Sequence, residues 1–499
     1  MDHHTNGSPG AAAGDLVTDA GTGSSSAAVL TDAGATPQAE IEVAATVSRE
    51  GDGEAWARTR DELARRGVDY CLAAYVDVHG VPKAKAVPVG HFTRMMKGSE
   101  LFTGAALDGL GQGPSDDELA VWPDLDAITV LPWERTVAWC PGQLHYHGEP
   151  WPLDSRTVLR RQLDRAAALG LRFNLGIETE FYLVRREGDG IVPANPKDVL
   201  PKAAYDVTGL LENLGFMHEI VGHMNELGWD VHSFDHEDAN SQFELDFHYA
   251  DGMAMADRYT LWRLMAKTVA RRHGVEATFM AKPYADRTGN GGHFNMSLAD
   301  LESGRNVFAD PGDPRGGGVS TLAYQFIAGI LRHAPAISAV CSPTVNSYKR
   351  LVKSGSMTGY TWAPVYISYG RNNRTHMLRL PYGSPRVESR AVDTSCNPYL
   401  AAAMLLGAGL EGIEQKLDPG DPIQLNMYEQ SDARLEELRV GVLPRTLLEA
   451  VEAFTADDLA DDVFGSDLKR EYAEVKSKEW WDYHNTVSAW EYDRYLEFF

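Results

Sequence analysis

The chain has 499 residues, of which 43% are hydrophobic and 23% charged, and this size and composition suit a globular protein of two or three domains. Its 71 Asp and Glu outnumber its 46 Lys and Arg, giving a formal net charge of -25. This balance argues against a general binder of nucleic acid or of anionic membranes, because both partners need a basic face.

Cysteine spacing and hydropathy indicate the compartment. The cysteines lie far apart with no C-x-x-C pair, which favours reduced thiols over a disulfide framework or a thiolate zinc site. The longest apolar run, 399–410, is too short to span a bilayer, and no basic segment followed by an apolar core marks a secretory signal. We therefore expect a soluble, cytoplasmic protein without a membrane or nucleic-acid partner.

The N-terminal residues differ in composition from the rest. Residues 1–50 contain no aromatic residue and one basic residue, Arg49, against seven acids. A segment rich in Ala, Gly, Ser and Thr buries too little apolar surface to offset its ordering entropy. The sequence therefore predicts a disordered tail over 1–55.

Folded elements are predicted from residue 56 onward. A short helix over 56–66 precedes two β-type runs within 68–89, which meet at a hairpin around Val78-His79-Gly80. Asp154 or Ser155 can cap a helix that runs to about Leu169. Strands and longer helices alternate after that, including a helix over 256–273. A small β-rich domain over 56–148 and a larger domain over 149–499 are expected.

Three strands of the larger domain carry polar side chains on one face. Side chains alternate along a strand, so the apolar residues of 173–184 face away from Glu178 and Glu180. In 291–298 the polar face holds His293, Asn295 and Ser297, and in 385–392 it holds Arg386, Glu388 and Arg390. Each could be an ordinary solvated face. Two neighbouring glutamates repel each other unless a cation lies between them, and a hard cation such as Mg²⁺ or Mn²⁺ suits carboxylates beside an imidazole.

Two further segments add to this pattern. Residues 236–248 offer Glu237 and, on a strand with an apolar opposite face, Glu244. Five arginines then fall within 41 residues: Arg350, Arg374, Arg379, Arg386 and Arg390. They could be scattered surface residues. Arginine forks match phosphate and carboxylate oxygens, so arginines beside carboxylates suggest a metal-nucleotide phosphoryl-transfer site.

At this point the motifs resemble a known family. IETEFYLV, HEDANSQFEL, TFMAKPYADRTGNGGHFNMSL, SPTVNSYKR, GRNNRTHMLRLP and PRVESRAVDTSCNPYLAAAMLLGAGLEGI follow, in order and spacing, the pattern of the glutamine synthetase family over 57–499. The resemblance is strongest to its γ-glutamylmethylamide synthetase and glutamate–amine ligase branch. It implies an α+β fold, with a β-grasp N-terminal domain and a catalytic domain built on a curved, mainly antiparallel sheet. It also implies a homo-oligomer, a dodecamer of two hexameric rings with active sites between neighbouring subunits.

The resemblance implies ATP as co-substrate, glutamate as acceptor and two or more Mg²⁺ or Mn²⁺ ions per site. One cation is expected at Glu180, Glu237 and Glu244, and a second at Glu178, His293 and Glu388. Glutamate is expected at Arg350, Arg390, Gly289 and Thr288. The nucleotide is expected at Arg379, Arg386, Ser297 and Asn295, and Arg374 is expected to stabilise the transferring phosphoryl group.

Two departures from the family concern the nitrogen substrate. Ammonia-using members carry an aspartate where FTGAA (102–106) places Thr103, and a flap glutamate where GYTWAP (359–364) places Trp362. An apolar, bulky Trp362 at the catalytic centre could line a pocket for an alkyl amine. We therefore expect an organic amine. An ordinary glutamine synthetase that uses other acids, such as Asp108, Asp116 or Asp117, and a ligase for an activated nucleophile such as hydrazine remain alternatives.

Overall fold

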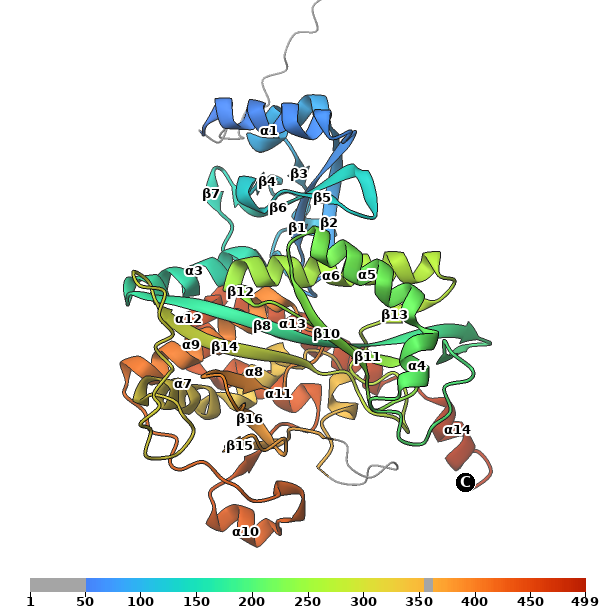
Figure 1. Ribbon diagram of the computed structural model, residues 1–499, viewed down its shortest axis with the longest axis vertical. Helices are drawn as coiled ribbons and strands as arrows, with labels where there is room; N and C mark the ends of the chain where they lie inside the picture. The colour runs from blue at the N-terminus through green and yellow to red at the C-terminus, as the bar shows by residue number, and fades with distance from the viewer. Residues whose placement is uncertain (1–50, 354–361) are drawn as a thin grey trace, which may run out of the picture. The chain divides into compact units, whose positions relative to one another are not determined.

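The computed structural model describes residues 51–353 and 362–499, which contain two β-sheets and the helices packed on them (Figure 1). The predicted tail lies outside the described residues up to residue 50. The first helix, α1 (Gly53–Arg65), begins three residues before the predicted start, because the Asp52 side chain accepts hydrogen bonds from the backbone N–H groups of Glu54 and Ala55.

The first sheet has seven strands in the order β2-β1-β6-β4-β3, with β5 and β7 also paired to β6. Its strands are β1 (Tyr70–Val76), β2 (Pro82–Pro88), β3 (Leu101–Phe102), β4 (Leu119–Pro123), β5 (Thr129–Leu131), β6 (Glu134–Tyr146) and β7 (Glu149–Pro150). The predicted hairpin is confirmed: β1 and β2 pair antiparallel, and Gly80 in their turn has a φ of 76°.

The second sheet has eleven strands in the order β10-β11-β8-β14-β17-β16-β15-β18, with β9, β12 and β13 also paired to β8. Among the strands of the described residues, β15 and β16 are the one pair in it that runs parallel. Its strands are β8 (Leu171–Glu187), β9 (Gly190–Pro193), β10 (Val231–His236), β11 (Gln242–Phe247), β12 (Ala250–Asp251), β13 (Glu276–Thr278), β14 (Gly292–Asp300), β15 (Tyr366–Arg371), β16 (His376–Leu380), β17 (Val387–Ser389) and β18 (Gly441–Val442).

One predicted strand is shorter than expected. The strand predicted over 385–392 is confined to β17, three residues long. Before β17, Pro385 has no N–H to donate to a sheet; after it, the Arg390 N–H donates a hydrogen bond to the carbonyl of Met377 in β16. Arg386 and Arg390 therefore flank the strand rather than lie within it.

The helices of the larger region begin in most cases with an acidic, hydroxyl or amide side chain as N-cap. They include α3 (Ser155–Ala168), α4 (Val207–Glu212), α5 (Leu214–Glu226), α6 (Gly252–Arg272), α7 (Thr321–Arg332), α8 (Ala334–Cys341), α9 (Pro398–Glu414), α10 (Asp432–Glu437), α11 (Leu447–Ala456), α12 (Asp458–Phe464), α13 (Ser466–His484) and α14 (Ala489–Tyr495). Asp154, not Ser155, caps α3. The α6 helix starts four residues before the predicted Ala256 because Asp251 caps it.

The apolar face of β8 forms the centre of the core. The side chains that the alternation assigned to this face are all at most 2% exposed: Phe173, Leu175, Ile177, Phe181 and Leu183. The ring of Phe181 packs edge-on against Trp262 of α6 at 5.6 Å. Burying each such side chain contributes roughly 1.5–3 kcal/mol. This packing fixes the register of β8 and turns Glu178 and Glu180 to the opposite face.

The longest apolar run of the sequence lies in helix α9, and nearly every residue of this helix is buried. Among the described residues, no helix is long and apolar enough to cross a membrane. All four cysteines are free and buried. The domain boundary expected at residue 149 stays a prediction.

Candidate active site

The polar face of the second sheet gathers carboxylates from neighbouring strands. On β8, Glu178 and Glu180 alternate with apolar residues, and Glu244 of β11 lies directly opposite Glu180 in the antiparallel ladder. Glu237 directly follows β10, whose residue Asp235 pairs with Glu244. Sheet register therefore brings together acids that are up to 66 residues apart in the sequence.

Three of these carboxylates form a compact cluster. One oxygen from each of Glu180, Glu237 and Glu244 lies within 4.8 Å of the others. Burial and repulsion from Glu237 raise the pKa of Glu180 to about 8, and burial with repulsion from Glu180 raises the pKa of Glu244. Buried like charges at this distance are costly unless a cation offsets them. The all-oxygen donor set fits a hard divalent cation.

A second cluster joins Glu178, Glu244 and His293, again with one ligand atom from each within 4.8 Å of the others. The His293 Nδ1 atom lies 3.2 Å from Glu178 and 3.9 Å from Glu388. Burial and the nearby charge of Arg390 lower the pKa of His293, which favours the neutral imidazole that a metal requires. Carboxylates with one neutral imidazole fit Mg²⁺ or Mn²⁺.

Glu388 lies at this cluster but contacts arginines. It is fully buried, and its two oxygens accept hydrogen bonds from Arg379 Nη1 and Arg390 Nη1, both at 2.6 Å. The family resemblance assigned them to different ligands: Glu388 to a metal, Arg379 to the nucleotide and Arg390 to glutamate. The structure joins them in one network, so charge at any of these positions acts on the others.

The glutamate-binding candidates converge around two glycines. Arg350 is 7% exposed and donates to the carbonyls of Ala391 and Arg390. A Cβ on Gly289 would lie 2.5 Å from the Ala281 carbonyl and 2.9 Å from Arg350 Cγ, so only glycine fits there. A Cβ on Gly291 would approach Arg350, Glu180 and His293 to 3.0 Å or less. The sequence reading missed Gly291.

Thr288, beside Gly289, is tied to the same turn. Its hydroxyl donates to Asp238 at 2.7 Å, and its carbonyl accepts from the Tyr182 hydroxyl at 2.5 Å. These bonds fix the backbone of the 288–291 segment next to the carboxylates.

The nucleotide-binding candidates also connect to the carboxylate face. Arg386 Nε donates to the Asn295 side-chain oxygen at 2.6 Å, and the Asn295 amide donates to Glu178 at 2.9 Å. Ser297 lies two residues further along β14 and therefore on the same face. Arg386, Asn295 and Ser297 thus border the second cluster.

Arg374 lies on the exposed turn between β15 and β16. Partial burial and the negative charges of Glu237 and Glu244 raise the pKa of the Tyr205 hydroxyl, and the positive charge of Arg374 opposes this shift. Tyr205 is 75% exposed and has a φ of 64°, and no residue pattern singled it out. Arg374 and Tyr205 therefore lie toward the solvent side of the carboxylate face.

Trp362 is described, whereas residues 354–361 of the same segment lie outside the described residues. Its side chain is 42% exposed and its φ is 51°, a backbone conformation rare for a bulky residue.

Thr103, at the other departure from the family, donates a hydrogen bond to Glu118. Asp108 and Asp117 contact His79 and His147, and Asp116 accepts from the Gly113 N–H.

Two acids extend the carboxylate face beyond the predicted set. Burial and repulsion from Glu237 and Asp246 raise the pKa of Asp235 to about 7, and burial with repulsion from Glu178 raises that of Asp246 to about 6. They continue the every-second-residue pattern of Glu237 and Glu244. That alternation was the signal that could have revealed them.

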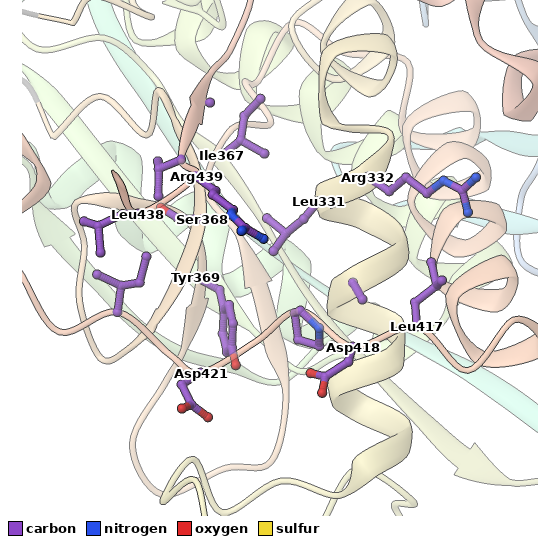
Figure 2. Close-up of a pocket in the computed structure, with 15 residues that line it drawn as sticks. Leu331, Arg332, Ile367, Ser368, Tyr369, Leu417, Asp418, Asp421, Leu438 and Arg439 are labelled. Carbon is purple, nitrogen blue, oxygen red and sulfur yellow. The ribbon is translucent and has the colours of Figure 1, made fainter. Parts of the chain in front are cut away.

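A separate cavity of about 370 Å³ lies between α7, β15 and β18. In Figure 2, Arg439 and Tyr369 line it, and Asp418 and Asp421 lie along its lower edge. Within the described part of the chain, none of the predicted site residues lines this cavity. It therefore does not belong to the site built here.

A curved sheet carries buried carboxylates on one face, bordered by buried arginines, and such a donor set suits divalent cations and anionic ligands. The family model "Glutamine synthetase, catalytic domain" matches residues 152–495, and the chain belongs to the glutamine synthetase family. It is an ATP-dependent ligase, and enzymes of this family use ATP and divalent metals.

Individual relatives cover almost the whole chain. A glutamate–methylamine ligase from Methyloversatilis universalis is 41% identical over 438 residues, 88% of this chain and 98% of the relative. A glutamine synthetase from Rhizobium leguminosarum bv. phaseoli is 37% identical over 87% of this chain and 97% of its own length. The solved structure of a GmaS/ADP complex matches with a TM-score of 0.82 and 37% identity, covering 88% of this chain and 99% of that one. The predicted family and fold class are confirmed.

Proposed function

We propose that the protein joins the γ-carboxyl group of L-glutamate to a small organic amine through a γ-glutamyl phosphate. In the first step a γ-carboxylate oxygen of glutamate attacks the terminal phosphorus of ATP, and ADP leaves. In the second step the amine nitrogen attacks the activated carbonyl carbon, inorganic phosphate leaves, and the nitrogen loses a proton. The carboxylate is a poor acyl donor until its oxygen is phosphorylated, which explains the need for ATP.

The two carboxylate clusters supply the proposed cation sites. Glu180, Glu237 and Glu244 would hold one cation, and Glu178, His293 and Glu388 the other. Bound divalent cations would shield the phosphate charge and polarise the phosphoryl oxygen. The buried, mutually repelling glutamates support this assignment, because their burial is costly without a counter-charge.

Arginines and backbone groups would position the substrates. Arg350 and Arg390 would pair with the carboxylates of glutamate, whose amino-acid end lies against Gly289 and Thr288. Arg379, Arg386, Asn295 and Ser297 would contact the nucleotide. Arg374 would approach the phosphoryl group as its charge spreads during transfer, an interaction worth roughly 3 kcal/mol in comparable sites.

The proposal of an organic amine rather than ammonia depends mainly on Trp362. It is 42% exposed, so it is not a core residue, and it occupies the flap position where the resemblance expects an ammonium-binding glutamate. An indole ring offers an apolar wall and a cation–π face to an alkylammonium ion. The 41% identity to a glutamate–methylamine ligase supports the same choice.

A panel of nitrogen nucleophiles tests the proposal. ATP- and glutamate-dependent phosphate release is measured with ammonia, methylamine, ethanolamine, isopropylamine, polyamines and hydrazine. We expect an organic amine to give the highest kcat/KM. Ammonia as the best substrate would establish a glutamine synthetase, and hydrazine would establish the ligase for an activated nucleophile. Glutamate labelled with ¹⁸O in its γ-carboxyl should transfer one label to phosphate.

The C-terminal residues support a homo-oligomer, for which the family resemblance implies a dodecamer. Large apolar side chains there are exposed: Trp490 (64%), Leu496 (69%), Phe498 (73%) and Phe499 (95%). An exposed apolar patch of this kind is typical of a protein–protein interface, here with a second copy of the chain. Light scattering should show that a chain ending at residue 487 forms a smaller assembly; an unchanged mass would contradict this role.

A further inference from the structure

The turn between β10 and β11 carries part of the first proposed cation site. Glu237 begins this turn, and Glu244 follows it on β11. Ser241, near the end of the turn, has a φ of 57°, a left-handed conformation that costs a non-glycine residue about 1 kcal/mol or more. Such a conformation persists only where surrounding contacts hold it.

Asp198 supplies those contacts from outside the family motifs. Its Oδ2 atom accepts hydrogen bonds from the Ser241 N–H at 2.5 Å and from His236 Nε2 at 2.7 Å, and its Oδ1 atom accepts from the Asn240 amide at 3.0 Å. The Asp198 side chain is 1% exposed. Because water does not compete for these bonds, they hold the turn more firmly than surface contacts would.

His236 extends the contact to the glutamate itself. Its side chain is fully buried, and its second ring nitrogen, Nδ1, lies 2.8 Å from the carbonyl oxygen of Glu237. The ring therefore bridges the Asp198 carboxylate and the backbone of the residue that offers a metal ligand. Behind the ring, a Cβ on Gly209 would lie 2.7 Å from His236 Cδ2, so α4 leaves the ring no room to turn away.

We propose that Asp198 is a positioning residue: through His236 and Ser241 it fixes the turn that presents Glu237 and thereby sets the affinity of the first cation site. This inference rests on the proposed function, in which Glu180, Glu237 and Glu244 hold that cation. Groups that orient metal ligands typically change metal affinity about 10–100-fold when they are replaced.

A second histidine–aspartate pair provides a matched control. In the helical region, Asp457 lies 2.9 Å from His333 Nδ1 and caps α12 through the Leu459 N–H. The His333 side chain is 8% exposed. Asp457→Asn therefore disrupts the same kind of pair without touching the 237–244 segment.

The experiment is a Mn²⁺ titration of the full-length chain, with free Mn²⁺ measured by electron paramagnetic resonance and the melting temperature recorded for each variant. Glu237→Gln identifies the binding that belongs to the first site, because among the clustered carboxylates Glu244 is shared with the second cluster and Glu237 is not. We expect Asp198→Asn to weaken that binding about 10–100-fold, and Asp457→Asn to leave it unchanged while lowering the melting temperature.

A double variant separates positioning from general destabilisation. Glycine adopts the left-handed conformation without strain, so Ser241→Gly added to Asp198→Asn should recover part of the lost Mn²⁺ affinity. If Asp198→Asn does not fold, Asn240→Ala removes one of the three bonds and should weaken Mn²⁺ binding by a smaller factor.

Two results would overturn the inference: Mn²⁺ affinity in Asp198→Asn within twofold of the wild type, or an equal loss in Asp457→Asn. If the wild type and Glu237→Gln bind Mn²⁺ equally, the first proposed cation site is wrong, and the role of Asp198 is wrong with it.

Discussion

The two sheets of this protein contain buried carboxylates with opposite surroundings. In the turn between β1 and β2 of the first sheet, Asp77 is 6% exposed; it accepts hydrogen bonds from the N–H groups of His79 and Val81 and pairs with Lys83. In the second sheet, Glu180 and Glu244 lie opposite each other, and burial with repulsion from Glu180 raises the pKa of Glu244. A carboxylate with hydrogen-bond and ion-pair partners stabilises a turn, whereas buried carboxylates that face one another favour binding of a cation between them.

The largest expected effect distinguishes these two kinds of carboxylate. Glu244→Gln removes a proposed metal ligand and should lower kcat/KM at least about 10³-fold, equivalent to about 4 kcal/mol of barrier. The same change relieves repulsion among buried charges, so the metal-free protein should melt at a higher temperature. Asp77→Asn should do the reverse, costing about 1–2 kcal/mol of stability with little change in Mn²⁺ affinity. If Glu244→Gln and Asp77→Asn change Mn²⁺ affinity equally, the two carboxylates do not differ in the way proposed.

Gly289 tests the close packing beside the carboxylate face. A methyl group there would clash with the Ala281 carbonyl and with Arg350, so Gly289→Ala should displace the arginine and raise the KM for glutamate roughly 10–100-fold. Gly53→Ala in α1 meets nothing within 4 Å and serves as the control. Steady-state kinetics with varied glutamate measure the effect, and an unchanged KM in Gly289→Ala would contradict the role assigned to Arg350.

The pH dependence of cation binding tests the electrostatics of the second sheet. Burial and repulsion raise the pKa of Glu180 to about 8, so below that pH a cation must displace a proton. Mn²⁺ affinity should therefore increase as pH rises from 6 to 8, by up to about tenfold per pH unit for each proton released, and level off above 8. Calorimetry in buffers of different ionisation enthalpy counts the protons, and an affinity that is flat from pH 6 to 8 would be inconsistent with these pKa values.

Trp362 gives the smallest expected effect, because it concerns selectivity rather than rate. Trp362→Glu should raise the kcat/KM ratio of ammonia to methylamine about tenfold, since a carboxylate holds ammonium better than an indole does. Trp362→Phe keeps an aromatic wall and should leave the ratio nearly unchanged. If the ratio in Trp362→Glu equals that of the wild type, the flap position does not select the amine.

The sequence predicted the polar face of the second sheet because strand alternation is a local property. Glu178, Glu180, Glu244 and His293 lie together as their alternation and family motifs indicated. Helix starts were less accurate: α1 and α6 begin earlier than predicted, because the caps Asp52 and Asp251 precede the apolar pattern.

Contacts between distant segments could not be read from the sequence. The bonds of Glu388 to Arg379 and Arg390, and those of Asp198 to the 236–241 turn, depend on how loops pack. No periodicity encodes such pairings, so they required the structure. Asp235 and Asp246 were partly predictable: strand alternation places them on the same face as Glu237 and Glu244, but the sequence does not show that they are buried.

The central claim is that the enzyme couples glutamate to an organic amine in preference to ammonia. The most direct measurement is a competition: limiting glutamate and ATP with equal concentrations of ammonia and the best amine of the panel in one reaction, and quantification of glutamine and γ-glutamylamide by mass spectrometry. We predict that the γ-glutamylamide predominates at every pH from 7 to 9. Glutamine as the main product would contradict the claim.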